Sequence, residues 1–468
     1  MTSNMLKIFH TYFPIRNILF ILGEGALIYL SLFIAMLLRF HWKAPEAEFT
    51  HTIWIRILLV TLVCQISLYY HELYEIKRVQ KIFDLSVRII QALGAACIIL
   101  AGIYYVYPPL ILGRGIFLIG LFLLIFFIVS WRFLYQCVIQ KNLFSEKLLL
   151  IGSGNLASLI AREIDDNFDS GYKIAAIVDN PDHSDLAKQL EVKSRNDYQH
   201  ICAMAETSGI KKIVVALDEK RGKFPSAVLL DCKMKGLTIV DGVSFYETLA
   251  GKILALQINP SSLIFSEGFR RNKFTLRGKR FLDIVLSAVG LVISVPLMLL
   301  TAIAIKATSK GPVFFKQTRI GQWKKPFSVI KFRTMRENAE THTGPIWAEK
   351  DDPRITKIGK ILRTLRLDEL PQFWNVLKGN MSFVGPRPER PMFVKKLEDK
   401  LPYYAERHTV KPGITGWAQI SYGYGASEED ALKKLEYDLF YIKHLSLLMD
   451  LLIVMKTIKT VILGKGAR

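Results

Sequence analysis

Residues 362–388 decide how this chain is interpreted, and they read L-R-T-L-R-L-D-E-L-P-Q-F-W-N-V-L-K-G-N-M-S-F-V-G-P-R-P. Two carboxylates, Asp368 and Glu369, stand side by side at a predicted helix start. Asp368 is expected to be the N-cap, Pro371 falls in the first turn, and Gly379 ends the helix. Helix N-termini favour negative charge, so we expect Asp368 to stay ionised, with a phosphate able to dock beside it.

Arginines flank this carboxylate pair on both sides. Arg363 precedes it, and Arg387 follows between two prolines that stiffen its backbone. Such a group suits phosphoryl transfer, in which positioning and charge stabilisation do most of the catalysis. The same residues would also serve an N-capped helix with surface ion pairs, so the stretch alone leaves both interpretations open.

The composition indicates a membrane protein with anionic partners. Of 468 residues, 51% are hydrophobic, yet the formal net charge is +21. This pairing is typical of a protein that faces an anionic leaflet and handles anionic substrates. The basic residues adjoin apolar runs without interleaved stacking aromatics, which disfavours a nucleic-acid partner.

The cysteines show no metal-binding or redox spacing. We therefore expect buried, reduced thiols in a protein whose soluble parts face a reducing compartment. No signal peptide is expected, because the first apolar run is too long and lacks a cleavage site. The five cysteines are Cys64, Cys97, Cys137, Cys202 and Cys232.

Four apolar runs open the chain, at about 18–38, 53–70, 89–106 and 111–130. Each is long enough, or nearly so, to cross a hydrocarbon layer of about 30 Å. Basic residues gather in the second loop and after the fourth run, which puts both ends in the cytoplasm. Residues 1–140 are therefore predicted to form a four-helix transmembrane bundle. Glu24 lies within the first run and is a candidate for a buried polar site lining the bundle.

A small parallel α/β domain of Rossmann-like type is predicted for residues 146–262. From Lys147 the sequence K-L-L-L-I-G-S-G-N-L-A predicts a buried strand, a glycine turn and a helix, and further strands alternate with helices. Gly152, Gly154 and Ala157 are similar to a dinucleotide fingerprint, and Asp179 stands where a ribose-binding acid would follow the second strand. The same glycines suit any tight strand–helix turn, so nucleotide binding stays one of two interpretations.

The apolar run 281–305 would by default be a fifth spanning helix. Both of its flanks are basic, and Ser294 and Pro296 break it near its middle. A crossing would also put Asp368 outside, away from cytosolic nucleotides. We therefore predict a re-entrant helix hairpin, and a catalytic domain over 275–468 on the cytoplasmic face. A last apolar stretch, 435–463, is predicted to lie in the membrane interface, because Asp450 and scattered lysines interrupt it.

Several motifs together resemble the large monotopic polyprenyl-phosphate phosphoglycosyl transferases, bacterial sugar transferases that start glycan assembly. The resemblance is close from residue 279 to the C-terminus, and the front half matches the family's large members as an architecture. One departure is Asn380, where many members have Asp. The matching motifs are K-R-F-L-D at 279, G-P-V-F-F-K-Q-T-R-I-G at 311, K-F-R-T-M at 331, L-D-E-L-P-Q at 367, G-N-M-S-F-V-G-P-R-P at 379, P-G-I-T-G-W-A-Q at 412 and Y-D-L-F-Y-I-K at 437.

The resemblance implies a two-step reaction centred on Asp368. This residue would attack the β-phosphate of a UDP-sugar and release UMP, and undecaprenyl phosphate would then take the phosphosugar from the enzyme. Mg²⁺ would touch Asp368 and the diphosphate. Glu369 would orient groups or accept a proton.

The remaining site residues follow from the same resemblance. Arg363 and Arg387 would bind phosphates, and Lys331, Arg333 and Arg319 are further candidates. Lys331 and Arg333 would share one face if they lie on a strand. Pro296 would set the hairpin angle that brings Asp368 to headgroup level.

The resemblance places the protein in the bacterial inner membrane, at the first membrane step of exopolysaccharide, O-antigen or capsule synthesis, with a possible homodimer. Glucose or galactose is the sugar that we expect to be transferred. One alternative is a membrane-bound nucleotide-sugar dehydratase or epimerase, although the α/β domain lacks a Tyr-x-x-x-Lys pair. Another is a non-catalytic, nucleotide-binding membrane scaffold, in which changing Asp368 would have no effect.

Overall fold

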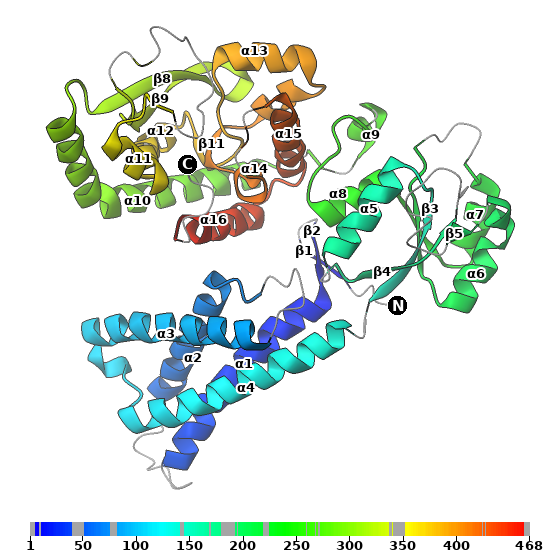
Figure 1. The fold of residues 1–468 in the computed structure, drawn as a ribbon, viewed down its shortest axis with the longest axis horizontal. Coiled ribbons are helices and arrows are strands. Elements are labelled where there is room, and N and C mark those ends of the chain that lie inside the picture. The colour runs from blue at the N-terminus through cyan, green and yellow to red at the C-terminus, as the bar shows by residue number, and fades with distance from the viewer. Residues whose placement is uncertain are drawn as a thin grey trace. The chain divides into compact units, whose positions relative to one another are not determined.

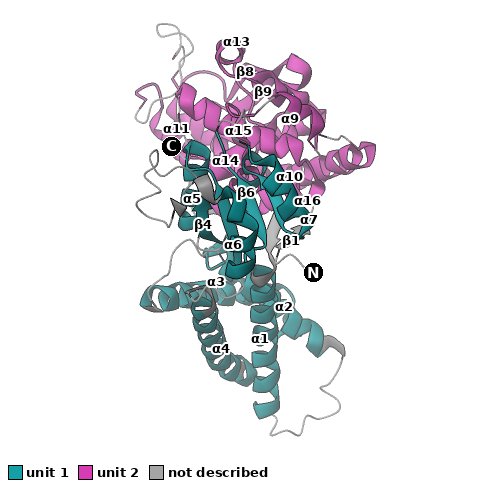
Figure 2. Cartoon of the chain, turned by 90° about the vertical axis from the view of Figure 1, so that its right-hand side faces the viewer, with its two compact units in different colours: residues 1–245 teal, residues 246–468 magenta. Residues whose placement is uncertain are grey.

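The computed structural model divides the chain into two compact units, residues 1–245 and 246–468 (Figure 2), which are described separately below. The structure describes residues 5–8, 11–39, 51–74, 82–140, 145–167, 170–178, 192–193, 195–218, 224–258, 260–266, 268–269, 272–336, 339, 352–423, 425 and 427–462.

Unit 1 begins with a short antiparallel hairpin and four long apolar helices (Figure 1). Among the described residues, five helices are long and apolar enough to cross a membrane, and these are four of them. The chain is therefore a membrane protein. Helix α1 packs against α2 and α4, and α2 packs against α3. The elements are β1 (Met5–Ile8), β2 (Thr11–Pro14), α1 (Ile15–Arg39), α2 (His51–Tyr70), α3 (Ile82–Val106), η1 (Pro108–Leu110) and α4 (Arg114–Gln140).

A buried ion pair joins two of these helices. Glu24 of α1 is fully buried, and its carboxylate lies 2.7 Å from the guanidinium of Arg132 on α4. Arg132 also donates to the carbonyl of Leu73, just after α2. A buried charge in an apolar surrounding requires such a partner, because leaving it unpaired would be very unfavourable.

The second part of unit 1 is a five-stranded parallel sheet with the strand order β5-β4-β3-β6-β7. It confirms the predicted parallel α/β domain, and its order reverses between β3 and β6. The elements are β3 (Glu146–Ile151), α5 (Asn155–Asp166), β4 (Tyr172–Val178), β5 (Val192–Lys193), η4 (Arg195–His200), α6 (Ile201–Ser208), β6 (Lys212–Val215), α7 (Ser226–Met234) and β7 (Thr238–Asp241). The next helix, α8 (Gly242–Ala250), contains the boundary between the two units.

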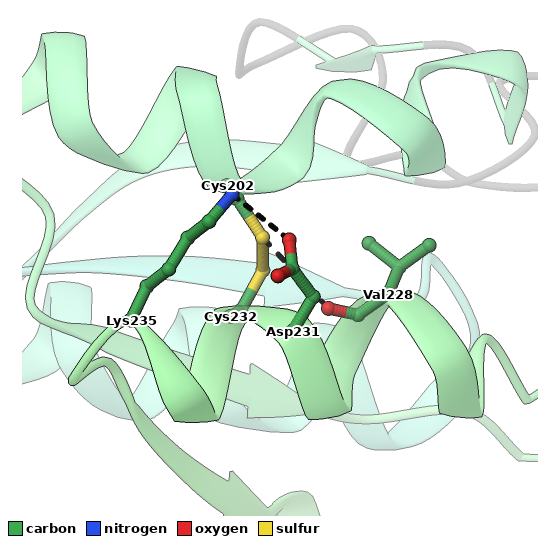
Figure 3. Close-up of a disulfide and its surroundings, with 5 residues drawn as sticks. All are labelled: Cys202, Val228, Asp231, Cys232 and Lys235. Atoms are coloured by element: carbon green, nitrogen blue, oxygen red, sulfur yellow. Dashed lines mark hydrogen bonds and ion pairs between the residues drawn. A yellow bond between two sulfur atoms is a disulfide. The ribbon is translucent and has the colours of Figure 1, made fainter.

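A disulfide connects α6 to α7 in this domain (Figure 3). Cys202 and Cys232 are 30 residues apart in sequence, but the two helices pack together and bring their Cα atoms to 5.3 Å. The expectation that every cysteine is reduced is therefore wrong for this pair. Cys64, Cys97 and Cys137 are free thiols.

Unit 2 wraps short strands and helices around one long helix, α10. Its core joins α15 and α16 to β10 and α13. The elements are α9 (Pro260–Phe265), α10 (Lys273–Thr308), β8 (Phe314–Ile320), η5 (Gln322–Lys324), β9 (Pro326–Phe332), α11 (Lys357–Thr364), η6 (Leu367–Glu369), α12 (Gln372–Lys378), β10 (Ser382–Val384), α13 (Pro391–Lys400), η7 (Tyr404–Thr409), β11 (Gly413–Thr415), α14 (Trp417–Ser421), α15 (Glu428–Lys443) and α16 (Leu447–Ile462).

The middle of helix α10 buries polar side chains and exposes apolar ones. Lys279, Asp283 and Ser287 are buried against the unit, whereas Val292 and Ile293 are among many exposed apolar residues of the helix. This is the reverse of a helix on a soluble protein, and it suits an apolar surrounding.

The same helix is continuous over 36 residues but bent, with Pro296 inside it (Figure 1). A proline removes one backbone hydrogen bond and bends a helix. Elements of unit 2 pack along its whole length: β10, α12 and α16 on one part, and Phe332 and Leu362 around Ile305 near its end.

The predicted interfacial stretch 435–463 is not a single helix. It is divided between α15 and α16, and Leu435, Leu439 and Phe440 of α15 are buried in the core of unit 2. Asp450 is also buried. Its carboxylate accepts a hydrogen bond of 2.8 Å from Lys279 on α10, which compensates for the loss of solvent. The sequence pattern missed this pairing, since the two partners lie 171 residues apart.

Candidate active site

The two carboxylates lie on the short 3₁₀ turn η6 rather than at a helix start. Arg366, just before η6, has a left-handed φ of +54°, and Pro371 is the N-cap of α12. The prediction that Asp368 caps the helix is therefore wrong. Asp368 and Glu369 belong to the separate turn η6, so α12 begins at Gln372, three residues later than expected. Gly379 ends α12 at φ +87°, as predicted.

Glu369 is held by two cations from different elements. Lys331 of β9 lies 2.9 Å from its Oε1 atom, and Arg387, after β10, lies 2.6 Å from the same atom. Burial acts to raise the pKa of Glu369, but Arg387 and Lys331 outweigh it, so the pKa falls well below its usual range. Glu369 therefore stays ionised and fixes both cations.

Asp368 has different surroundings. It is 9% exposed, and none of the hydrogen bonds between described residues involves its carboxylate. Burial and the neighbouring charge of Glu369 raise the pKa of Asp368, although Lys331, Arg363 and Arg387 act in the opposite direction. The shift is thus opposite to the one expected from a helix N-terminus. Asp368 is a carboxylate without a protein donor, close to several cations.

Two further predicted cations, Arg363 and Arg319, lie near the carboxylates and contact other groups. Arg363, on α11, donates from Nε to Thr334 at 3.0 Å and acts electrostatically on Asp368. Arg319, on β8, binds the carbonyl of Pro388 at 3.1 Å and thus holds the segment that carries Arg387. Burial lowers the pKa of Arg319 to about 10.

Arg333 has contacts that the sequence did not predict. Its guanidinium donates to the carbonyls of Ser309 and Lys310, at the end of α10. It does not join Lys331 at the carboxylates, because β9 ends at Phe332 and the alternation of side chains ends with it. Arg333 therefore fastens the end of α10 to β9.

Three buried residues that the sequence analysis did not single out support Arg387. Arg407 donates to the Arg387 carbonyl at 3.0 Å, to Asp438 at 2.8 Å and to the Tyr404 hydroxyl at 2.6 Å. Arg407 precedes the P-G-I-T-G motif and Asp438 lies inside Y-D-L-F-Y-I-K, so the motifs pointed to this region without showing the contact.

The residues fit a hard metal ion held mainly by substrate. No group of three or more His, Cys, Asp or Glu residues able to hold a metal occurs among the described positions. Mg²⁺ commonly binds one or two carboxylates together with substrate phosphates and water. Asp368, whose carboxylate accepts no hydrogen bond from the part of the chain that the structure describes, is suited to that arrangement.

The second predicted site lies at the glycine turn after β3. Gly152 has a φ of +120° and approaches the backbone of Ala216, and Gly154 precedes α5. Asp179 lies outside the described residues.

Comparison with known proteins identifies the family of the chain. A family model described as bacterial sugar transferase matches residues 274–464, and one described as CoA-binding domain matches 70–224. The UDP-glucose:undecaprenyl-phosphate glucose-1-phosphate transferase of Caulobacter vibrioides is 41% identical over 193 residues, which are 40% of this chain and 71% of the relative. The chain belongs to the bacterial sugar transferase family.

Two further relatives cover different shares of the chain. The UDP-N-acetylgalactosamine-undecaprenyl-phosphate N-acetylgalactosaminephosphotransferase of Aeromonas hydrophila is 50% identical over 190 residues, 41% of this chain and 45% of the relative. The undecaprenyl-phosphate glucose phosphotransferase of Komagataeibacter xylinus is 29% identical over 402 residues, 78% of this chain and 72% of the relative. The chain thus spans less than half of the Aeromonas relative.

Proposed function

We propose that this protein transfers a sugar 1-phosphate from a UDP-sugar to undecaprenyl phosphate and releases UMP. One observation carries the proposal: among the described residues none donates a hydrogen bond to the Asp368 carboxylate, while Glu369 beside it is held by Lys331 and Arg387. The relatives named above are undecaprenyl-phosphate sugar phosphotransferases, which supports the same reaction class.

The reaction would proceed in two displacements at one phosphorus atom. In the first, a carboxylate oxygen of Asp368 bonds to the β-phosphorus, the bond to the bridging oxygen breaks, and UMP leaves with the electron pair. In the second, an oxygen of the lipid phosphate bonds to the same phosphorus, and the bond to Asp368 breaks. The carboxylate is restored, and the product is a lipid diphosphosugar.

The cations around the carboxylates have distinct parts in this scheme. Arg387 and Lys331 are already fixed by Glu369, so they need little reorganisation when charge develops on the diphosphate. Arg363 approaches Asp368 from α11 and would bind a phosphate oxygen. Bound Mg²⁺ would supply further neutralisation of the diphosphate charge, with Asp368 as its protein ligand.

The acceptor explains why the site lies beside α10. Undecaprenyl phosphate keeps its tail in the bilayer and its phosphate at headgroup level. The outward apolar face of α10, with its buried polar face toward β10 and α12, supports a helix that enters and leaves one leaflet. We propose that this leaflet is the inner one of the cytoplasmic membrane.

UMP release in detergent tests the proposal. Wild type, Asp368→Asn and Glu369→Gln are incubated with undecaprenyl phosphate, Mg²⁺ and a panel of UDP-glucose, UDP-galactose and UDP-N-acetylgalactosamine. We expect one or two sugars to yield UMP and Asp368→Asn to abolish it. No UMP from any of the sugars, or unchanged release by Asp368→Asn, would instead favour a non-catalytic scaffold.

A further inference from the structure

The carboxyl edge of the α/β sheet is where parallel folds of this kind bind ligands, at the point where the strand order reverses. In this chain that point lies between the ends of β3 and β6. The glycine turn after β3 and the match to a CoA-binding model both imply a nucleotide with a pyrophosphate. Such a group would rest on the first backbone amides of α5, the helix that follows β3.

Those amides already bind an anion that belongs to the chain itself. The carboxylate of Asp218, beyond the end of β6, accepts from the Asn155 amide at 2.8 Å and from the Leu156 amide at 3.2 Å. Both oxygens of the side chain are used, one for each amide. A charged acceptor at a helix N-terminus is stabilised by the amides and by the helix dipole.

Close contacts within the domain explain why both positions of the turn, 152 and 154, are glycine. A Cβ atom on Gly152 would overlap the carbonyl of Ala216, where β3 and β6 come together, and its φ of +120° disfavours other residues. A Cβ atom on Gly154 would overlap the Asp218 carboxylate. In a dinucleotide fingerprint the second glycine leaves room for the pyrophosphate. Here that room holds Asp218.

At the start of α8, on the same edge of the sheet, a backbone amide also donates to an aspartate of the chain. Asp241, the last residue of β7, accepts from the Ser244 amide at the start of α8, at 3.3 Å. Two helix N-termini at the carboxyl edge therefore carry aspartate caps. A phosphate at either helix start would have to displace the carboxylate that already accepts from its backbone amides.

We propose that Asp218 is an internal anion in the position of the pyrophosphate, and that this α/β domain binds neither CoA nor a dinucleotide. The glycine turn then serves the fold by admitting the carboxylate that joins the end of β6 to the start of α5. The inference does not depend on the reaction proposed for unit 2.

Two measurements on the full-length protein in detergent test this proposal. Binding of CoA is followed by calorimetry and binding of NADH by fluorescence, with UDP added to occupy the candidate active site. We expect no saturable binding to wild type at millimolar ligand. Saturable binding of either ligand to wild type would overturn the proposal.

The second measurement asks whether an added anion can replace the side chain. Asp218→Ala exposes two amides, so we expect its Tm to fall by about 2–4 °C. Added inorganic phosphate should recover most of this loss. The matched control is Asp231→Ala, which removes an exposed aspartate of α7 in the same domain. Phosphate raising the Tm of Asp218→Ala no more than that of wild type and the control would contradict the proposal.

If Asp218→Ala cannot be purified, Asp218→Asn takes its place in the same comparison. It keeps one acceptor oxygen and loses the charge. We expect a smaller fall in Tm and a phosphate response that still exceeds that of the control. Equal responses would contradict the proposal.

Discussion

Asp368 and Glu369 are neighbours in the chain, yet their side chains have opposite surroundings. Glu369 binds two cations, which keep its pKa well below the usual range, whereas burial and the charge of Glu369 raise the pKa of Asp368. Two carboxylates whose pKa values are pushed apart are typical of a site with divided roles. In our proposal Glu369 fixes the cations and Asp368 forms the bond to phosphorus.

The pH dependence of UMP release tests this division at the level of the residue. The attacking form of Asp368 is ionised, so activity is present above its pKa and is lost as pH falls through it. Glu369→Gln removes the adjacent negative charge and leaves Lys331 and Arg387 acting on Asp368. We therefore expect the acid limb of kcat/KM to move to lower pH, while the maximal rate falls by about 10²-fold or more. An acid limb that stays in place or moves upward would contradict the assignment.

At the scale of elements, the buried guanidinium of Arg407 holds the loop after β10 in place. One guanidinium nitrogen of Arg407, on η7, donates both to the Arg387 carbonyl and to the Asp438 carboxylate on α15. Arg407 is a positioning residue in our account, because its contact is with the backbone of Arg387 rather than with substrate.

Replacing Arg407 by Lys keeps the charge but loses the fork that reaches several acceptors together. We expect kcat/KM for the UDP-sugar to fall by about 10-fold, mainly through KM, with the acid limb unchanged. The control is Lys378→Ala, an exposed residue of α12, which should leave both constants unaltered. If Arg407→Lys lowered the Tm but left KM unaltered, Arg407 would be purely structural.

Helix α10 offers a second prediction at this scale. Arg277→Cys and Lys306→Cys, near the two ends of the helix, are made as separate variants in a background without free thiols. If α10 enters and leaves one leaflet, a membrane-impermeant thiol reagent should label both positions from the cytoplasmic side only. Labelling of the two positions from opposite sides would show that the helix crosses the membrane.

The sequence predicted the elements whose signals are local. The buried strand before Gly152 and the alternation of strands with helices predicted the parallel sheet. The broken helix hairpin predicted at Pro296 is instead one continuous, bent helix, α10. The sequence did not predict the partners of Arg333, Arg407 or Asp450, because these contacts join segments far apart in the chain. The start of α12 was misplaced for a local reason, since Pro371 took the cap position expected for Asp368.

At the scale of the whole molecule, the cysteines divide into one disulfide, Cys202–Cys232, and three free thiols. Unreduced protein, denatured in the presence of a thiol reagent, should show three reactive thiols, and reduced protein should show five. Replacing both residues by Ser should lower stability by about 2–4 kcal/mol and leave UMP release unaltered, since unit 2 contains neither cysteine. Five reactive thiols before reduction would contradict the disulfide.

The central claim is that Asp368 carries the sugar phosphate between donor and acceptor, and intact-protein mass spectrometry tests it most directly. The protein is mixed with its UDP-sugar without undecaprenyl phosphate and quenched rapidly. We expect a mass increase of one sugar phosphate, up to one UMP per protein, no such increase in Asp368→Asn, and loss of the added mass when undecaprenyl phosphate is supplied. Turnover by wild type with no added mass, or an equal increase in Asp368→Asn, would contradict the account.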